Sequence, residues 1–126
     1  KLSLKVKDAK VTYHDPCRLG RHMGVYDAPR NVLTAIKGVT LKELDETRED
    51  AQCCGVSAWV GCSTEAKVLM VQKLDSAVKT GAATLVTACP KCYAHLNCIK
   101  SEKPPIKDFS IEVVDFTTFL ARGGGS

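Results

Sequence analysis

Hydrophobic positions along this chain fall into two patterns, which follow one another in turn. Short unbroken apolar runs are typical of buried strands, whereas apolar residues recurring every three or four positions indicate amphipathic helices. The runs at 10–14, 39–44, 82–88 and 111–114 therefore predict strands, and the run at 82–88 predicts a strand buried on both faces of a sheet.

The strongest helical pattern follows Cys62, where Ser63 or Thr64 can cap the start of a helix and Gly81 can end it. This pattern separates an apolar face from a polar face, as expected for a helix packed on a sheet. We expect the apolar face to comprise Ala66, Leu69, Met70, Leu74, Ala77 and Val78, and the polar face to comprise Lys67, Gln72, Lys73, Asp75 and Lys79.

Shorter helices are predicted in three other places. Asp27 can cap a helix that has Pro29 in its first turn and ends at Gly38. A short helical stretch after Cys89 is expected to run through Leu96. A final helix, capped by Asp115, is expected to carry Phe116, Phe119 and Leu120.

Strands that alternate with helices predict an α/β fold, with a largely parallel sheet and helices on its faces. In such sheets ligands gather at the carboxyl ends of strands. Cys17 and Cys89 each follow a predicted strand, so we expect a site there. We also expect one domain over residues 1–122, excised from a larger protein, with 123–126 as a flexible tail.

Composition narrows the class of protein. The chain of 126 residues has seven cysteines, although it is long enough to build a core without disulfides. No secretory leader or membrane span is recognisable, so a reducing, cytoplasmic location is expected. The net charge of +4 arises within residues 1–30 and forms no dense basic stripe, so nucleic-acid binding is not expected.

Five of the cysteines form an ordered pattern, in which 35 and 34 residues separate a single cysteine, an adjacent pair and a CxxC motif. In the first turn of a helix, a CxxC motif places both sulfurs on the same side. The adjacent pair can face one site only through a tight turn, which Gly55 permits. The five are Cys17, Cys53, Cys54, Cys89 and Cys92, and the remaining two, Cys62 and Cys98, are expected to be packing residues.

This pattern favours a metal centre. A single zinc ion needs four ligands, whereas five sulfurs favour an iron–sulfur cluster, whose several irons accept more thiolates. Arg18 and Arg21 follow Cys17 and could balance the negative charge of such a cluster. Two alternatives stay open: a structural zinc module that mediates subunit contact, and a thioredoxin-like dithiol enzyme that uses Cys89 and Cys92.

Four segments resemble a known family. Thr-Tyr-His-Asp-Pro-Cys-Arg-Leu-Gly-Arg at 12–21, Gly-Val-Tyr-Asp-Ala-Pro-Arg at 24–30, Cys-Cys-Gly at 53–55 and Val-Thr-Ala-Cys-Pro-Lys-Cys at 86–92 are similar to the cysteine-rich CCG domain. That domain occurs in heterodisulfide reductase, in its B and D subunits, and in the iron–sulfur subunits of glycolate and lactate oxidation systems. The resemblance implies an α/β domain and a noncubane 4Fe-4S cluster held by Cys17, Cys53, Cys54, Cys89 and Cys92, with zinc as a substitute.

The resemblance further implies an oxidoreductase that reduces a small-molecule disulfide at the cluster, with electrons arriving one at a time. Implied partners are a second CCG domain, a ferredoxin-like iron–sulfur domain or subunit, and a flavoprotein or membrane cytochrome subunit that would bring the domain to the cytoplasmic face of a membrane. The isolated domain is expected to be inactive. The sequence departs from the family at 56–60, where Val-Ser-Ala-Trp-Val replaces the glycine run of many members.

Four other polar or aromatic residues are assigned smaller roles. We expect His14 to be a hydrogen-bonding structural residue and His95 to lie at the surface, although each could donate a proton near the cluster. Lys91 is expected to tune the cluster electrostatically. Trp59 is expected to pack or to form an interface.

Overall fold

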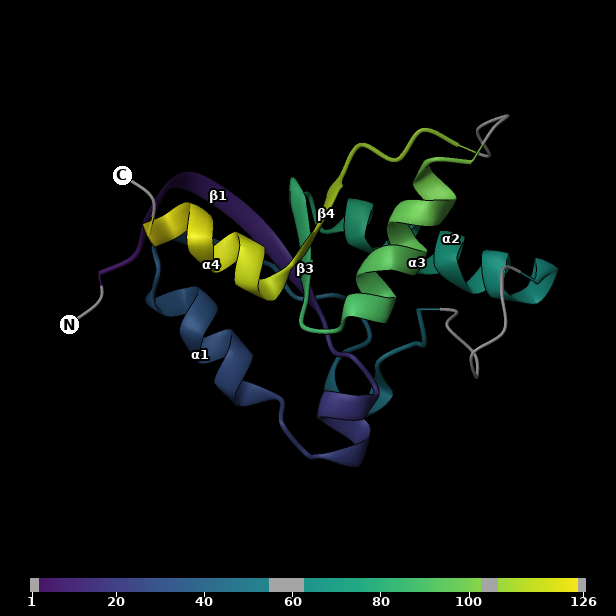
Figure 1. The fold of residues 1–126 in the computed structure, drawn as a ribbon, viewed down its shortest axis with the longest axis horizontal. Helices are drawn as coiled ribbons and strands as arrows, with labels where there is room; N and C mark the ends of the chain where they lie inside the picture. The colour runs from purple at the N-terminus through teal and green to yellow at the C-terminus, as the bar shows by residue number, and fades with distance from the viewer. Residues whose placement is uncertain (1–2, 55–62, 103–106, 125–126) are drawn as a thin grey trace.

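The structure is a computed structural model that describes residues 3–54, 63–102 and 107–124. Strands and helices alternate along the described chain, and two short helical segments, η1 and η2, lie between them (Figure 1). The elements are β1 Lys5–His14, η1 Arg18–His22, α1 Asp27–Ala35, β2 Lys37–Leu41, η2 Arg48–Asp50, α2 Thr64–Lys79, β3 Thr84–Thr87, α3 Pro90–Lys100, β4 Glu112–Asp115 and α4 Phe116–Gly124.

The four strands form one sheet in the order β2-β1-β3-β4, and each adjacent pair is parallel. The predicted α/β fold with a parallel sheet is therefore confirmed. Strands β1 and β3 lie side by side at the centre, with His14 opposite Thr87 in register. Their carboxyl ends consequently meet at one edge, where the chain leaves β1 towards Cys17 and β3 towards Cys89.

Helices cover both faces of the sheet, with α2 and α3 on one side and α1 and α4 on the other (Figure 1). Neighbouring residues of a strand point to opposite faces, and Leu85 and Val86 of β3 accordingly belong to different cores. This confirms that β3 is buried on both faces. The α2/α3 core includes Met70, Leu74, Leu85, Leu96 and Val113, and the α1/α4 core includes Val11, Tyr13, Leu33, Val86 and Phe119.

The predicted helix starts are confirmed in two of three cases. Ser63 caps α2, since its Oγ accepts a hydrogen bond from the amide of Ala66 at 3.1 Å. Asp115 caps α4, because its Oδ1 accepts from the amide of Thr117 at 3.0 Å. The third prediction is wrong, because Asp27 lies inside α1 as an acidic residue of the first turn, where the helix dipole favours a negative charge.

The loop between α1 and β2 differs from the prediction because Gly38 does not end the helix. Gly38 lies in β2 with φ of +93°, and a Cβ atom there would come within 2.0 Å of the carbonyl oxygen of Val6. Only glycine therefore allows β2 to approach β1 this closely. At the other end of the chain, α4 runs to Gly124, so the first two residues of the expected tail lie in this helix.

Two expected side-chain positions are wrong. Lys73, expected on the polar face of α2, is buried with 2% of its surface exposed. Cys98, expected to pack near a helix end, is exposed on α3, which continues to Lys100. Expectations for Gly55, residues 56–60 with Trp59, and Cys62 concern positions outside the described residues. Among the described helices, none combines the length and the apolar composition needed to cross a bilayer.

Candidate metal centre

Three separate segments bring cysteines to the carboxyl edge of the sheet. Cys17 stands at the start of η1, two residues after Asp15, which follows β1 directly. Cys89 stands at the start of α3, directly before Pro90. Because β1 and β3 are adjacent and parallel, the two cysteines follow neighbouring strand ends.

The CxxC motif forms the first turn of α3, as predicted. Cys89 occupies the N-cap position, and its carbonyl accepts a hydrogen bond from the amide of Tyr93 at 3.0 Å. Pro90, at the first helical position, fits there because an amide at that position would have no partner within the helix. Cys92 is therefore close to the positive end of the dipole of α3, which favours negative charge on sulfur.

The Cys53-Cys54 pair arrives on an irregular segment that is tied to the β1 loop by two hydrogen bonds. The guanidinium of Arg21 donates to the carbonyl of Ala51 at 3.1 Å, and the amide of Arg48 donates to Asp15 at 2.9 Å. These bonds fix the chain just before the cysteine pair. The loops on either side of the site are therefore joined by polar contacts rather than by the sheet.

All five predicted ligands line one pocket at this edge, so the structure brings together the complete set. Cys54 and Cys92 are buried, Cys89 is half-buried, and Cys17 and Cys53 are exposed. The sulfurs of Cys54 and Cys92 lie 3.0 Å apart. The pocket is also lined by His14, Asp15, Arg18, Arg21, Arg48 and Lys91.

Electrostatics at the buried side of the pocket depend on the hydrogen bond between the Cys54 and Cys92 thiols. The hydrogen bond with Cys54, burial and the neighbouring thiols raise the pKa of Cys92 strongly. Two thiolates this close repel each other unless a cation joins them. Metal binding would replace the protons, so this side of the site is arranged for a positively charged ligand.

His14 is a member of the site that sequence reasoning assigned to a structural role. Its ring lies with the buried sulfurs of Cys54 and Cys92, and the three potential ligand atoms are within 4.8 Å of one another. Burial lowers the pKa of His14, although a hydrogen bond with Cys54 acts in the opposite direction. Its Nδ1 atom is buried and has no hydrogen-bond partner among the described residues. The position of His14 at the end of a strand that leads to Cys17 was the available signal.

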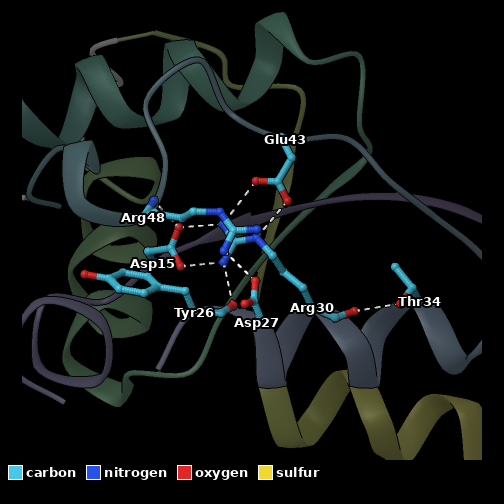
Figure 2. A network of polar contacts seen from close by, with 7 residues as sticks. All are labelled: Asp15, Tyr26, Asp27, Arg30, Thr34, Glu43 and Arg48. Atoms are coloured by element: carbon cyan, nitrogen blue, oxygen red, sulfur yellow. Dashed lines mark hydrogen bonds and ion pairs between the residues drawn. The ribbon is translucent and has the colours of Figure 1, made fainter. Parts of the chain in front are cut away.

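Figure 2 shows that Arg30 of α1 joins the two loops that flank the site. Its guanidinium donates to both carboxylate oxygens of Asp15 at 2.7 and 2.6 Å and to those of Glu43 at 2.8 and 3.0 Å. Burial alone would raise the pKa of Asp15, but the bonds from Arg30 and from the Arg48 amide hold it below its usual range. The Arg30 guanidinium also lies 5.2 Å from the ring centre of Tyr13.

The donor set fits a soft metal centre. Thiolates favour zinc and iron–sulfur clusters over magnesium or calcium, which prefer oxygen ligands. Five cysteines exceed the four ligands of a structural zinc ion and suit a cluster with several irons. A thioredoxin-like dithiol would use only Cys89 and Cys92, and it leaves three cysteines of the same pocket without a role.

A parallel α/β domain with cysteines gathered at the carboxyl edge of its sheet has the arrangement of a cysteine-rich metal-binding domain. The sequence model of the cysteine-rich CCG domain matches residues 11–97, a span that contains all five cysteines. The chain belongs to the CCG cysteine-rich domain family.

Three curated relatives of this chain are oxidoreductases or oxidoreductase subunits. The chain is 43% identical over 127 residues to the D subunit of the dihydromethanophenazine:CoB–CoM heterodisulfide reductase of Methanosarcina acetivorans, covering 96% of this chain and 29% of the relative. It is 36% identical over 115 residues to the probable iron-sulfur-binding oxidoreductase FadF of Bacillus subtilis, covering 89% and 16%. It is 39% identical over 92 residues to an EtfAB:quinone oxidoreductase of Syntrophomonas wolfei, covering 66% and 13%. The chain thus spans less than a third of the length of these relatives.

Proposed function

We propose that this domain binds an iron–sulfur cluster through Cys17, Cys53, Cys54, Cys89 and Cys92 and serves a heterodisulfide reductase-like oxidoreductase. The observation that carries this proposal is the convergence of all five cysteines, from three separate segments, on one pocket. The chain is 43% identical to the D subunit of a heterodisulfide reductase, in an alignment that covers 96% of the chain, and this similarity supports the same assignment. The noncubane 4Fe-4S form implied by the family pattern is part of the proposal.

When bound, the cluster would supply one-electron transfer and a position at which a disulfide substrate is reduced. The residues of this chain have separate tasks around it. Cys54 and Cys92 would hold the cluster on its buried side, away from water. Cys17 and Cys53 are exposed and would hold it on the solvent side. Arg18, Arg21 and Lys91 place positive charge around the pocket and offset the negative charge of the thiolates.

The partners belong to the proposal as well. We infer that the domain works beside a second CCG domain and a ferredoxin-like iron–sulfur domain or subunit, since it spans only 29% of its heterodisulfide reductase relative. A flavoprotein or membrane cytochrome subunit would supply electrons and hold the assembly at the cytoplasmic face of a membrane. A relative described as a probable membrane-anchored ferredoxin, 32% identical over 114 residues, is consistent with that location.

Anaerobic reconstitution tests the ligand assignment. The chain is incubated with iron and sulfide, and iron, sulfide and the EPR spectrum are then measured. We expect several irons per chain in the wild type, and a changed spectrum or lost iron in Cys53→Ser. Cys98→Ser is the matched control, because Cys98 is also an exposed cysteine but lies on α3. Absence of a cluster in the wild type, or equal spectra in the two variants, rejects the assignment.

A zinc module is the second candidate function, favoured by the group of His14, Cys54 and Cys92. One imidazole and two sulfurs are common zinc ligands, and a further cysteine of the pocket would complete four. Zinc in this pocket would stabilise the domain or a subunit contact without electron transfer. One tightly bound zinc per chain after anaerobic purification, with no redox signal, would establish this function instead.

A further inference from the structure

Lys73 is a buried cation beside the proposed cluster site. It lies on α2 with 2% of its surface exposed, among the apolar residues of the α2/α3 core. Burying an ammonium group is costly unless an opposite charge compensates it. Within the described part of the chain, no carboxylate forms an ion pair with Lys73 at contact distance. An ammonium at this position therefore needs a compensating charge other than a carboxylate in contact with it.

The two buried thiols share a core with the helical neighbours of Lys73, because Met70 and Leu74 pack in one cluster with Cys54 and Cys92. Burial lowers the pKa of Lys73, whereas Cys54, Glu46, Asp15 and Cys92 raise it, and Cys54 has the largest effect of these four. The carboxylate of Asp15 is already held by two hydrogen bonds from Arg30. Asp45 and Glu46 are exposed, so water screens their charges, and the buried thiols are the best placed to compensate Lys73 once they are deprotonated.

Lys73 and the basic residues of the cysteine pocket line two different pockets. Arg18, Arg21, Arg48 and Lys91 line the cysteine pocket. Lys73 lines an adjoining pocket with Leu44, Asp45, Glu46, Gln52 and Ser76. Gln52 lines both pockets, so they are neighbours. Water screens the exposed charges of Arg18 and Arg21, but it screens the buried charge of Lys73 much less.

We propose that Lys73 is a buried electrostatic positioning residue, whose ammonium compensates the Cys54 and Cys92 thiolates and stabilises the reduced state of the cluster. This inference rests on the proposed function, because it requires the cluster at these cysteines. Each added electron increases the negative charge of a cluster, so a nearby fixed cation favours reduction. Lys73 therefore makes the midpoint potential less negative than the cysteine ligands alone would set it.

A charge-matched pair of variants tests the inference in the full chain. Lys73→Met removes the buried ammonium and keeps much of its volume, and Lys79→Met removes an exposed ammonium from the same helix. Iron and sulfide content are measured first, and the one-electron midpoint potential is then determined by redox titration followed by EPR. We expect full loading of both variants. In Lys73→Met alone, the reduction equilibrium should shift at least tenfold towards the oxidised form, equivalent to about 59 mV for one electron.

The outcomes separate the two proposals. If the wild type takes up no iron and sulfide, the proposed function fails. If the wild type loads but Lys73→Met and Lys79→Met have equal potentials, the function stands and the inference is wrong. A folded Lys73→Met variant that cannot retain the cluster contradicts the expected full loading and overturns the inference, because Lys73 then supports the site rather than its potential. Should Lys73→Met not fold, Lys73→Gln enters the same comparison, and a failure of both to fold shows that Lys73 has only a structural role.

Discussion

Arg30 and Asp15 form a buried bidentate ion pair, with Nη1 and Nη2 of the arginine donating to Oδ1 and Oδ2 of the aspartate at 2.7 and 2.6 Å. The pair joins α1 to the loop between β1 and Cys17 (Figure 2). Two parallel hydrogen bonds fix the relative orientation of both groups as well as their distance. The direction in which the chain leaves β1 towards the first cysteine is thereby set by a residue of α1.

Arg30→Met is expected to destabilise the domain by about 3–5 kcal/mol, because it leaves the Asp15 carboxylate buried without its partner. Arg30→Lys keeps the charge but cannot bind both carboxylates bidentately, so an intermediate loss is expected. Urea unfolding of the reduced, metal-free chain measures both losses.

The control for this prediction is Arg122→Met, which breaks an exposed ion pair with Glu112. We expect it to cost less than about 1 kcal/mol, since water screens exposed pairs. Equal losses for Arg30→Met and Arg122→Met would contradict the role of the buried pair.

His14→Gln is expected to separate the two candidate cofactors. If His14 is a zinc ligand, its replacement should weaken zinc binding by about tenfold or more. Iron and sulfide loading through the five cysteines should stay at the wild-type level, because no imidazole belongs to the proposed cluster ligands. Competition with a zinc chelator and iron analysis measure the two quantities, and loss of iron together with zinc would show that His14 supports both centres.

Asp115 is expected to stabilise α4 in a pH-dependent way. Hydrogen bonds from Thr117 and Thr118 lower the pKa of Asp115 below the value of about 3.9 typical of an unfolded chain. The ionised carboxylate therefore contributes stability that is fully present above pH ~4 and is lost as the pH falls through the lower, folded pKa.

Asp115→Ala should accordingly cost about 1 kcal/mol at pH 7 and progressively less below pH ~4. Thermal unfolding across this pH range gives the difference from the wild type. Asp108→Ala, at an exposed position outside any helix, serves as the control and should differ little from the wild type at pH 7. A cost for Asp115→Ala that does not change with pH would contradict the ionised cap.

Ser63→Ala is expected to destabilise the domain by about 1 kcal/mol, because the amide of Ala66 loses its acceptor at the start of α2. The exposed Ser110→Ala, which lies outside helices and strands, should change the unfolding free energy by less than about 0.5 kcal/mol. Urea unfolding measures both variants. Equal effects would mean that the cap contributes nothing to the helix that carries Lys73.

The alternation of strands and helices was enough to predict the parallel α/β fold. Each short apolar run predicted a strand, and each apolar repeat of three or four residues predicted a helix. The cysteine spacing predicted which residues meet, since neighbouring parallel strands end at one edge. Side-chain burial was harder to predict where charge and spacing disagree. Lys73 lies seven residues after Ala66 and four before Ala77, which is core spacing, but its charge favoured the polar face.

Contacts between distant segments could not be predicted in this way. Arg30 lies among ordinary polar residues of a helix, and no local pattern indicates that it reaches Asp15 and Glu43. Asp27 looked like a cap because its sequence context suits one, but the helix begins at this residue and its carboxylate pairs with Arg48 instead. These ion pairs join residues that are distant in the sequence, and they form only when the folded sheet brings their loops together.

The alternation of side chains along β1 has a consequence for changes in chain length. Tyr13 belongs to the α1/α4 core, where its ring lies under Arg30, whereas the next residue, His14, lies on the opposite face beside Cys54 and Cys92. Inserting or deleting one residue before Tyr13, with the pairing of β1 otherwise kept, would exchange these two faces. The anchor of one loop and the imidazole of the site would be lost together. β1 should therefore tolerate substitutions far better than insertions or deletions.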